Sequence, residues 1–225
     1  MSAEDDKRLA AEAAVAEVRD GMTVGLGTGS TAAFAVAALA HRVAAGLKMQ
    51  AVATSKSTAR AAQSAGIEVI DFADCPAVDI AIDGTDEIDE RFWAIKGAGG
   101  AMLREKAVAA AARRFIVIAD GSKRVARIGA AKLPVEVLPF ARSFVVTKLA
   151  ALGAAVSIRP DYRTDNENLV ADCRFQSMAD PRALAAQIMS IPGVLGHGLF
   201  LDEVDAAYIA ARGTVARLER DERSD

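Results

Sequence analysis

The amino-acid sequence predicts an α/β protein in which a Rossmann-like domain with an open parallel sheet is joined to a smaller ferredoxin-like α+β domain. In the first half of the chain, short β-branched apolar runs alternate with alanine-rich stretches, the pattern of a parallel sheet flanked by helices. After Gly129 the order changes to βαββαβ, which is typical of a ferredoxin-like unit. A last apolar run at 206–210 is expected to rejoin the first sheet. We therefore expect one domain from residues 1–129 and 204–225 and a second from 130–203.

The elements of the first domain follow from local composition. Its expected strands are short and rich in valine and isoleucine, and its expected helices are rich in alanine and other strong helix formers. The strands are expected over 23–27, 49–53, 67–70, 78–83 and 115–119. The helices are expected over 5–18, 30–45, 56–65 and 100–113.

The second domain contains the same two kinds of segment in a different order. Its strands are expected over 133–138, 154–158, 168–174 and 193–200, and its helices over 141–152 and 181–189. The first of these strands is expected despite Pro134. The charged sequence LERDERSD at 218–225 is expected to be frayed, as weakly anchored chain ends are.

Composition and charge exclude several classes of protein. A chain of 225 residues can bury one sizeable core and a second small one. A formal net charge of −3 gives no basic field that would attract a nucleic acid, so we expect no such partner. No apolar run approaches the ~20 residues of a membrane-spanning helix, and the first residues lack the basic start and apolar stretch of a secretory signal. We expect a cytoplasmic protein with no membrane partner.

Cysteine and histidine are too few for the common metal and nucleophile sites. Cys75 and Cys173 are far apart and outside any CxxC pattern, so we expect two reduced thiols and no disulfide framework or cysteine zinc site. His41 and His197 are the only histidines, which rules out a zinc site with several histidine ligands. His41 is expected on a helix surface and His197 in a loop or at a strand edge.

Five polar segments follow the expected strands of the first domain. In an open parallel sheet, ligands bind beyond the carboxyl ends of the strands, so residues at these positions converge on one edge. The segments are GLGTGST at 25–31, TSKST at 54–58, DGTDEID at 83–89, KGAGGAMLREK at 96–106 and ADGSK at 119–123. Together they predict a binding pocket.

The segment GLGTGST has the composition of an anion site. Its glycines allow a tight turn, and Thr28, Ser30 and Thr31 place hydroxyl and amide groups where a helix begins, so a phosphate would fit there. The spacing is GxGxG rather than the dinucleotide pattern GxGxxG, and no acidic residue ends the next strand, so a nicotinamide cofactor is disfavoured. A glycine turn capped by serine, with no ligand, explains this segment equally well when it is taken alone.

The segment DGTDEID gathers acidic residues at the end of a buried strand. Like charges in a confined site repel each other and need a compensating cation. Lys96 is close in sequence and could supply that charge, whereas the spacing of an EF-hand calcium loop is absent. A calcium or magnesium site is the alternative for this acidic cluster. A solvated acidic loop is a second alternative for Glu87, Asp89 and Glu90, and a weaker one for Asp83, which directly ends an apolar run.

In KGAGGAMLREK, glycines lead directly into a helix whose first turns carry Glu105. Exposed amides and the positive helix end favour an ionised Glu105 that is available as a base. The simpler alternative is a glutamate that only complements the helix dipole. Lys106 is expected at the surface. Lys123, which follows the fifth strand, could anchor an anion.

GTGST, DGTDEID, KGAGGAMLREK and ADGSK, in this order and at this spacing, resemble ribose-5-phosphate isomerase of type A. The similarity runs over essentially the whole chain, including LPVEVLPFA, TDNENLV and IPGVLGHGLF. It implies an aldose-ketose isomerase that interconverts D-ribose 5-phosphate and D-ribulose 5-phosphate through a cis-enediolate, in the non-oxidative pentose phosphate pathway. It also implies no metal, no organic cofactor and a homodimer or homotetramer.

The resemblance also implies roles for individual residues, with Glu105 as the general base. The implied catalytic residues are Glu105, Asp83, Asp86 and Lys96, and the implied substrate-binding residues are Thr28, Gly29, Ser30, Thr31, Asp83, Gly84, Thr85, Asp86, Lys96, Gly97, Ala98, Gly99 and Lys123. Two positions depart from the family pattern, since Ala98 stands where glycine is common and Thr85 where alanine is usual. If position 98 required a positive φ angle, alanine would cost about 1 kcal/mol or more.

Isomerisation of this kind requires removal of the proton next to a carbonyl and its return to the neighbouring carbon. Lys96 and the amides of 97–100 are candidates to stabilise the enediolate oxygen. Asp83 and Asp86 could grip hydroxyl groups and help to open the sugar ring, and Lys7 could also reach the phosphate.

Two other functions use similar features. A non-catalytic sugar-phosphate sensor needs the phosphate loop but no base, and the chain lacks a basic helix-turn-helix extension. A CoA-transferase-like enzyme would use Glu105 as a nucleophile, but it would need a second subunit or domain and a site for a large nucleotide tail.

Overall fold

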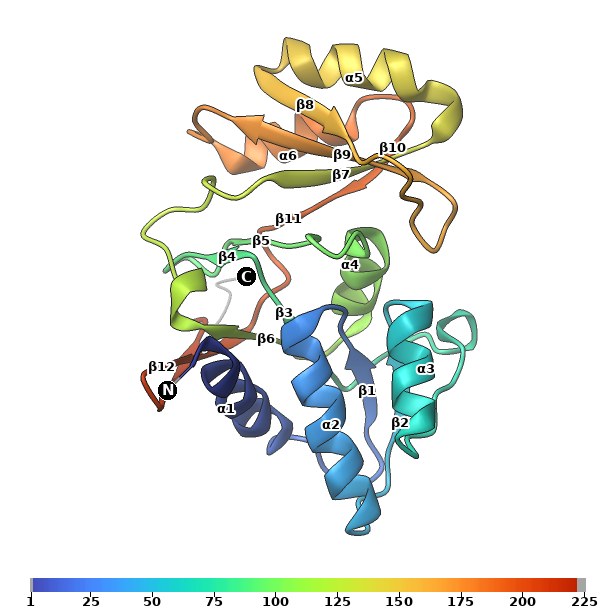
Figure 1. Cartoon of the computed structure of the whole chain (residues 1–225), viewed down its shortest axis with the longest axis vertical. Helices are drawn as coiled ribbons and strands as arrows, with labels where there is room; N and C mark the ends of the chain where they lie inside the picture. The colour runs from blue at the N-terminus through green and yellow to red at the C-terminus, as the bar shows by residue number, and fades with distance from the viewer. Residues whose placement is uncertain (1, 222–225) are drawn as a thin grey trace.

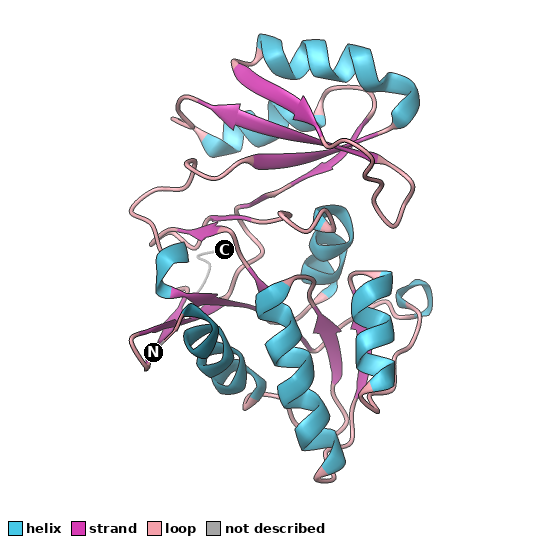
Figure 2. Ribbon diagram, in the orientation of Figure 1, coloured by secondary structure: helices cyan, strands magenta, loops and turns pink. Residues whose placement is uncertain are grey.

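The computed structural model describes residues 2–221 and arranges them around two main sheets, which lie one above the other in Figures 1 and 2. A short third sheet lies between them. None of the helices in residues 2–221 is long and apolar enough to cross a membrane.

The larger sheet has six strands in the order β13-β12-β6-β3-β1-β2. Their bounds are β1 (Thr23–Leu26), β2 (Gln50–Ala53), β3 (Ile80–Gly84), β6 (Phe115–Asp120), β12 (Ala206–Ala211) and β13 (Thr214–Glu219). All neighbouring pairs are parallel except β12 and β13. The chain moves from β1 to β2 on one side and then to β3 on the other, so the order reverses between β1 and β3. A crevice at such a reversal is where ligands bind in open α/β sheets.

Helices cover both faces of this sheet. Their bounds are α1 (Ala3–Val15), α2 (Ser30–Ala44), α3 (Lys56–Ser64) and α4 (Met102–Ala111). Alanine and leucine side chains of α1, α2 and α3 pack with Ile82 and Ile118 in one buried cluster, and α1 and α2 lie side by side in Figure 1. Val108 of α4 packs with Val117 in another cluster. Because successive strand residues face opposite sides, α4 covers the face that the other three helices leave open.

The smaller main sheet confirms the predicted ferredoxin-like unit. Its elements are β7 (Leu133–Val137), α5 (Arg142–Ala151), β8 (Ala154–Ile158), β9 (Leu169–Phe175), α6 (Pro181–Met189) and β10 (Val194–His197). The strands are antiparallel in the order β10-β7-β9-β8. One buried cluster joins the sheet to both helices, with Val145 of α5 and Ile188 of α6 packed against Leu133 and Ala171.

The expected strand at 193–200 is wrong in one respect, because it divides at Gly198. Residues before it belong to β10, whereas β11 (Leu199–Phe200) joins β4 (Glu87–Ile88) and β5 (Ala94–Ile95) in the short third sheet. The Gly198 amide donates to Pro134 O, and its carbonyl accepts from Lys96 N, each at 2.9 Å. A side chain at 198 would lie 2.1 Å from the Lys96 carbonyl oxygen, so only glycine fits this crossing.

Two other sequence predictions need correction. Residues 67–70 form no named strand, because only an isolated bridge joins Val69 to Ala51. The end of the chain was expected to fray from residue 218, but Leu218 and Glu219 lie in β13. Arg220 is also held, since its amide donates to Asp205 O at 2.8 Å. Residues 222–225 of that expectation lie outside the described residues.

Residues 214–219 form β13 because a tight hairpin turn returns the chain alongside β12. Arg212 and Gly213 both have positive φ angles, 51° and 83°, as a two-residue hairpin turn requires. The carboxylate of Asp6 on α1 accepts both turn amides, at 3.1 and 2.9 Å. The run at 206–210 lies in β12, which pairs with β6, so its predicted return to the first sheet is confirmed.

Candidate active site

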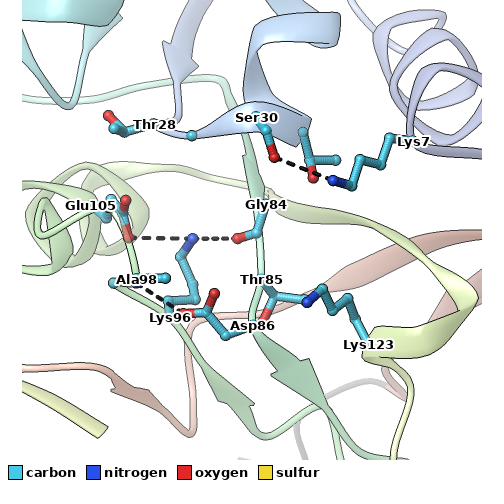
Figure 3. Close-up of a pocket in the computed structure, with 14 residues that line it drawn as sticks. Lys7, Thr28, Ser30, Gly84, Thr85, Asp86, Lys96, Ala98, Glu105 and Lys123 are labelled. Carbon is cyan, nitrogen blue, oxygen red and sulfur yellow. Dashed lines mark hydrogen bonds and ion pairs between the residues drawn. The ribbon is translucent and has the colours of Figure 1, made fainter. Parts of the chain in front are cut away.

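A cavity of about 290 Å³ lies at the carboxyl ends of β1 and β3, where the order of the strands reverses (Figure 3). Its lining residues are Lys7, Thr28, Gly29, Ser30, Thr31, Gly84, Thr85, Asp86, Lys96, Gly97, Ala98, Gly99, Glu105 and Lys123. The structure therefore brings together every site residue expected from the sequence except Asp83, which lies behind the lining in contact with Lys96. Lys7 joins them from α1.

The glycine loop after β1 forms the end of the cavity at which the sequence predicts an anion, here called the anion end. Gly27 lies so close to Asp83 that a Cβ atom there would overlap the carboxylate, at 2.0 Å. Gly29 has a φ of 115° and directly precedes α2, which begins at Ser30. The first amides of a helix have no partner within the helix and carry the positive end of its dipole, so they favour an anion.

Two lysines add positive charge to this end. Lys7 Nζ donates to Ser30 Oγ at 3.3 Å. Lys123 comes from the turn after β6 and forms no ion pair within 4 Å in residues 2–221. Figure 3 shows both side chains reaching the cavity from the side of α1 and β6.

Behind the glycine loop, the hydroxyl of Thr28 is fixed by its neighbours. Thr28 Oγ1 lies 2.7 Å from Thr54 Oγ1 and 3.3 Å from Thr58 Oγ1. Thr54 and Thr58 in turn donate to Leu26 O and Gly27 O. The segment TSKST was recognised in the sequence as a polar strand end, but its role as a support for Thr28 becomes visible only in three dimensions.

Three buried charges form the other end of the cavity. Lys96 Nζ lies 2.9 Å from Asp83 Oδ2. It also lies 3.4 Å from Glu105 Oε2 and donates to Gly84 O (Figure 3). All three side chains are at most 3% exposed. Asp83 Oδ1 also accepts the amides of Thr28 and Gly84, at 3.1 and 2.7 Å. Lys96 is thus the cation that the acidic segment required.

Burial governs the proton affinity of this group. The pKa of Glu105 is raised to about 8, because burial and the nearby Asp83 carboxylate raise it more than Lys96 lowers it. Burial also raises the pKa of Asp83, against the effect of Lys96 and two backbone amides. The two carboxylates keep the pKa of Lys96 above its usual value despite burial. The sequence predicted an ionised Glu105, whereas the raised pKa makes both its protonated and its ionised forms accessible near neutral pH.

A loop formed by 97–100 closes the cavity beside these charges. The Ala98 amide donates to Asp86 Oδ2 at 3.0 Å, and the Gly100 amide donates to Gly97 O at 2.8 Å. Two of the four amides proposed for oxyanion stabilisation therefore already have partners, one within the loop and one on Asp86. The Gly99 amide has no partner in the described part of the chain.

The two departures from the family pattern cause no strain. Positive φ angles in this loop fall on Gly97 and Gly100, at 100° and 78°, and not on Ala98. The expected penalty for alanine at 98 is therefore absent. Thr85 is buried, and its hydroxyl lies within hydrogen-bond distance of Glu87 O and Ile95 O, at 2.7 and 3.0 Å. The extra hydroxyl is thus satisfied within the turn between β3 and β4.

The neighbouring acidic residues serve the framework. Glu87 is buried, and its carboxylate accepts the amides of Gly129 and Ala131, both at 2.7 Å. Asp89 is also buried and pairs with Arg91 at 3.3 Å. A solvated loop is therefore the wrong interpretation for both carboxylates. Within residues 2–221, no group of three or more histidine, cysteine or acidic side chains is placed to hold a metal ion.

Other titratable residues lie outside the cavity. Lys106, expected at the surface, is partly buried and pairs with Glu203 at 2.9 Å. His197 is buried in β10, its Nδ1 accepts the Leu199 amide at 3.1 Å, and burial lowers its pKa to about 4. Cys173 is buried, which raises the pKa of its thiol to about 12. None of these groups is suited to catalysis in the cavity.

Comparisons with known proteins agree with this geometry. The family model described as ribose 5-phosphate isomerase A (phosphoriboisomerase A) matches residues 50–213. The chain is 53% identical to ribose-5-phosphate isomerase A of Sphingopyxis alaskensis, over 91% of this chain and 92% of that protein. It is 48% identical to the protein of the same name from Roseiflexus castenholzii, over 95% and 94%.

Solved structures with this fold carry the same name. The crystal structure of ribose 5 phosphate isomerase A from Neisseria gonorrhoeae has a TM-score of 0.93 at 35% identity, over 98% of this chain and 99% of that chain. A D-ribose-5-phosphate isomerase in complex with phospho-erythronic acid has a TM-score of 0.94 at 32% identity, over 98% and 100%.

Proposed function

Because this chain belongs to the ribose 5-phosphate isomerase A family, we propose that it interconverts D-ribose 5-phosphate and D-ribulose 5-phosphate, with Glu105 as the general base. The observation that carries the proposal is a single cavity lined by an anion site at one end and by Lys96 and Glu105 at the other. A relative of the same fold was solved with phospho-erythronic acid, a phosphorylated sugar acid, and a sugar phosphate is the ligand that we expect here.

The phosphate is held by the first turn of α2, with Ser30 and Thr31, and by Lys7 and Lys123. This tether fixes the sugar chain relative to Glu105 and so converts binding into orientation, which can supply several kcal/mol of the barrier reduction. Asp83 and Asp86 act on the sugar hydroxyls and assist ring opening, because the carbonyl must be free before the neighbouring proton becomes acidic.

In the open chain, the Glu105 carboxylate removes the proton at carbon 2 and returns it to carbon 1. The intermediate is a cis-enediolate, and its oxygen faces the ammonium group of Lys96. A positioned base contributes about 10²- to 10⁴-fold, so the charge stabilisation supplied by Lys96 is a necessary part of the rate enhancement. A pKa near the working pH suits a group that must both accept and donate the same proton.

Labelled water provides a direct test of this proton transfer. Purified protein treated with a chelator and incubated with ribose 5-phosphate in deuterated water should produce the ketose and place deuterium at carbon 2 of the recovered aldose. Binding without turnover would instead support the sensor, which family membership already disfavours. Turnover that needs added metal would contradict the metal-free mechanism.

A conservative substitution tests the base itself. Glu105→Gln keeps the shape of the side chain and should lower kcat by at least ~10²-fold, with little change in phosphate binding. The matched control is Glu68→Gln, because Glu68 is exposed and far from the cavity lining. Near-normal turnover by Glu105→Gln would refute the assignment.

Several finer features extend this proposal. Residues 1–129 with 204–225 form the catalytic domain, and residues 130–203 form the second domain. The enzyme acts in the cytoplasm, without a metal or organic cofactor, in the non-oxidative pentose phosphate pathway. It forms a homodimer or homotetramer, in keeping with three exposed apolar side chains close together in sequence, Leu138, Phe140 and Phe144, of which Phe140 is 96% exposed.

A further inference from the structure

The segment between β8 and β9 reaches from the smaller main sheet to the active site. In Figure 1 it is the yellow-orange loop that descends from the upper sheet toward α4. Its residues contact the loop 97–100 and also Arg104 of α4, whose Nε donates to Asn166 Oδ1 at 2.8 Å. The second sheet therefore contacts the catalytic loop through side chains that the mechanism above does not use.

Arg159 holds two successive carbonyl groups of that loop. Its Nη1 donates to Ala98 O at 2.9 Å, and its Nη2 donates to Gly97 O at 3.2 Å. The guanidinium is fixed in turn by Asp172, whose carboxylate accepts from Nε and Nη2 at 2.7 to 3.1 Å. Because the guanidinium is planar and is itself held by Asp172, it fixes the direction of the two carbonyl groups in addition to supplying a positive charge.

Because the peptide group is planar, fixing the direction of a carbonyl group also fixes the direction of the amide in the same peptide. In a trans peptide the N–H group points away from the carbonyl oxygen. With Gly97 O and Ala98 O both held by Arg159, the amides of Ala98 and Gly99 both point away from the guanidinium. The Ala98 amide reaches Asp86, whereas the Gly99 amide has no partner in residues 2–221 and belongs to a residue that lines the cavity. Successive amides on one side form a concavity that favours an anion.

Tyr162 holds the next carbonyl in the same way. Its hydroxyl donates to Gly99 O at 2.8 Å. The ring lies so close to the chain that a Cβ atom at position 100 would lie 2.1 Å from the hydroxyl oxygen, and Gly100 also has a positive φ of 78°. Three consecutive carbonyls are thus fixed from outside the cavity by two side chains.

The segment itself is anchored by a buried carboxylate. Glu136 of β7 is fully buried, and its Oε1 accepts from Thr164 Oγ1, Asn166 Nδ2 and Asn168 Nδ2, at 2.8, 3.1 and 2.9 Å. Such an anchor limits the movement of the segment that carries Tyr162.

On the basis of the isomerase activity proposed above, we propose that Arg159 and Tyr162 are positioning residues that aim the Gly99 amide at the enediolate oxygen. They act through the backbone of the loop 97–100 and do not touch the substrate. The second sheet thereby contributes to catalysis by fixing a donor that is needed chiefly when negative charge develops on the oxygen.

Three variants separate geometry from charge. Arg159→Met should lower kcat by about 10- to 100-fold, because a displacement near 1 Å can cost 10²-fold, while KM for ribose 5-phosphate changes little. Arg159→Lys keeps the charge but loses the fork, and its kcat should stay at least about 5-fold low. Tyr162→Phe removes one neutral hydrogen bond and should lower kcat by about 3- to 10-fold.

Controls and a second readout complete the experiment. Arg163→Met removes a nearby exposed charge that has no ion pair in residues 2–221, and it should behave like the wild type. Competitive inhibition by inorganic phosphate should be unchanged in all four variants, since the anion end is untouched. If Arg159→Met does not fold, Tyr162→Phe and Arg159→Lys still decide the question.

The outcomes distinguish this inference from the proposed function. A wild type without turnover would remove the isomerase assignment itself. The positioning role alone would be overturned by a different set of results. In that set the wild type turns over and Glu105→Gln is inactive, but the folded Arg159 and Tyr162 variants keep the wild-type kcat. If Arg159→Lys kept the wild-type kcat while Arg159→Met had a low kcat, the effect would come from charge. That result would also overturn the positioning role.

Discussion

At one end of the cavity the polar groups are helix amides, hydroxyls and two lysines, whereas at the other they are three charges that are at most 3% exposed. The anion end comes from one continuous segment after β1, with lysines added from α1 and the turn after β6. The buried end joins β3, the residue after β5 and α4. Binding can therefore rely on local backbone geometry, whereas the proton chemistry depends on burial created by the whole fold.

The largest expected effect comes from removing the shared cation at the buried end. Lys96→Met would leave Asp83 and Glu105 close together without compensation, and breaking a buried ion pair in this way costs about 3–5 kcal/mol. It should also lower kcat by at least ~10²-fold, since it removes the positive charge that stabilises the enediolate oxygen. Urea unfolding and steady-state rates measure the two effects.

The control for that variant is Lys48→Met, at an exposed lysine outside the cavity lining. It should change neither stability nor kcat appreciably. If Lys96→Met unfolded at the same urea concentration as the wild type, Lys96 would not be the cation that compensates Asp83 and Glu105 in the folded state.

The next largest effect is the pH dependence of the rate and of the stability, which we expect to come from the buried end of the cavity. Only ionised Glu105 can accept the proton, so kcat/KM should rise about tenfold per pH unit below its pKa of about 8 and level off above it. Stability should show the opposite sign. The pKa of Glu105 is 4.5 in the unfolded state and about 8 in the folded state, so the folded state binds more protons between these pH values. The contribution of Glu105 to the free energy of unfolding is therefore fully present below pH 4.5 and is lost as the pH rises to 8.

Two measurements check these opposite trends. The first is kcat/KM between pH 6.5 and 9, and the second is urea unfolding at pH 6.5 and at pH 9. Glu105→Gln should lose the fall in stability with pH. A flat rate profile across this range, in an enzyme limited by chemistry, would place the pKa of Glu105 elsewhere.

The smallest expected effect belongs to the anion end. Lys123→Met should raise KM for ribose 5-phosphate by about 10-fold, the low end for losing a charge-assisted hydrogen bond, and should change kcat by less than about 3-fold. Substrate saturation curves give both constants, with Lys48→Met again as the control. A large fall in kcat at unchanged KM would mean that Lys123 belongs to the chemistry rather than to binding.

This contrast also explains what could be predicted from the sequence. The glycine loop and the ferredoxin-like order are local patterns, and the sequence predicted both. The raised pKa of Glu105 depends on burial and on the proximity of Asp83, which no local pattern reports. The contacts of Arg159 and Tyr162 span more than 60 residues and have no sequence signal.

Some elements were missed although a signal was present. The pair Arg212 and Gly213 between an apolar run and an alternating run indicates a hairpin, and the chain does turn there into β13. The short strands β4 and β5 have only two residues each, too few for any periodicity to appear. The split at Gly198 follows from a close backbone approach that becomes visible only when Lys96 is placed beside it.

That crossing at Gly198 bears on how the enzyme can move. Its amide and carbonyl tie the first strand of the upper sheet to the residue that carries the shared ammonium group. A hinge rotation between the two layers would have to break both bonds at a site where no larger residue fits. We therefore expect substrate to enter and leave through side-chain and loop motion around a rigid frame, with no swinging of one layer against the other.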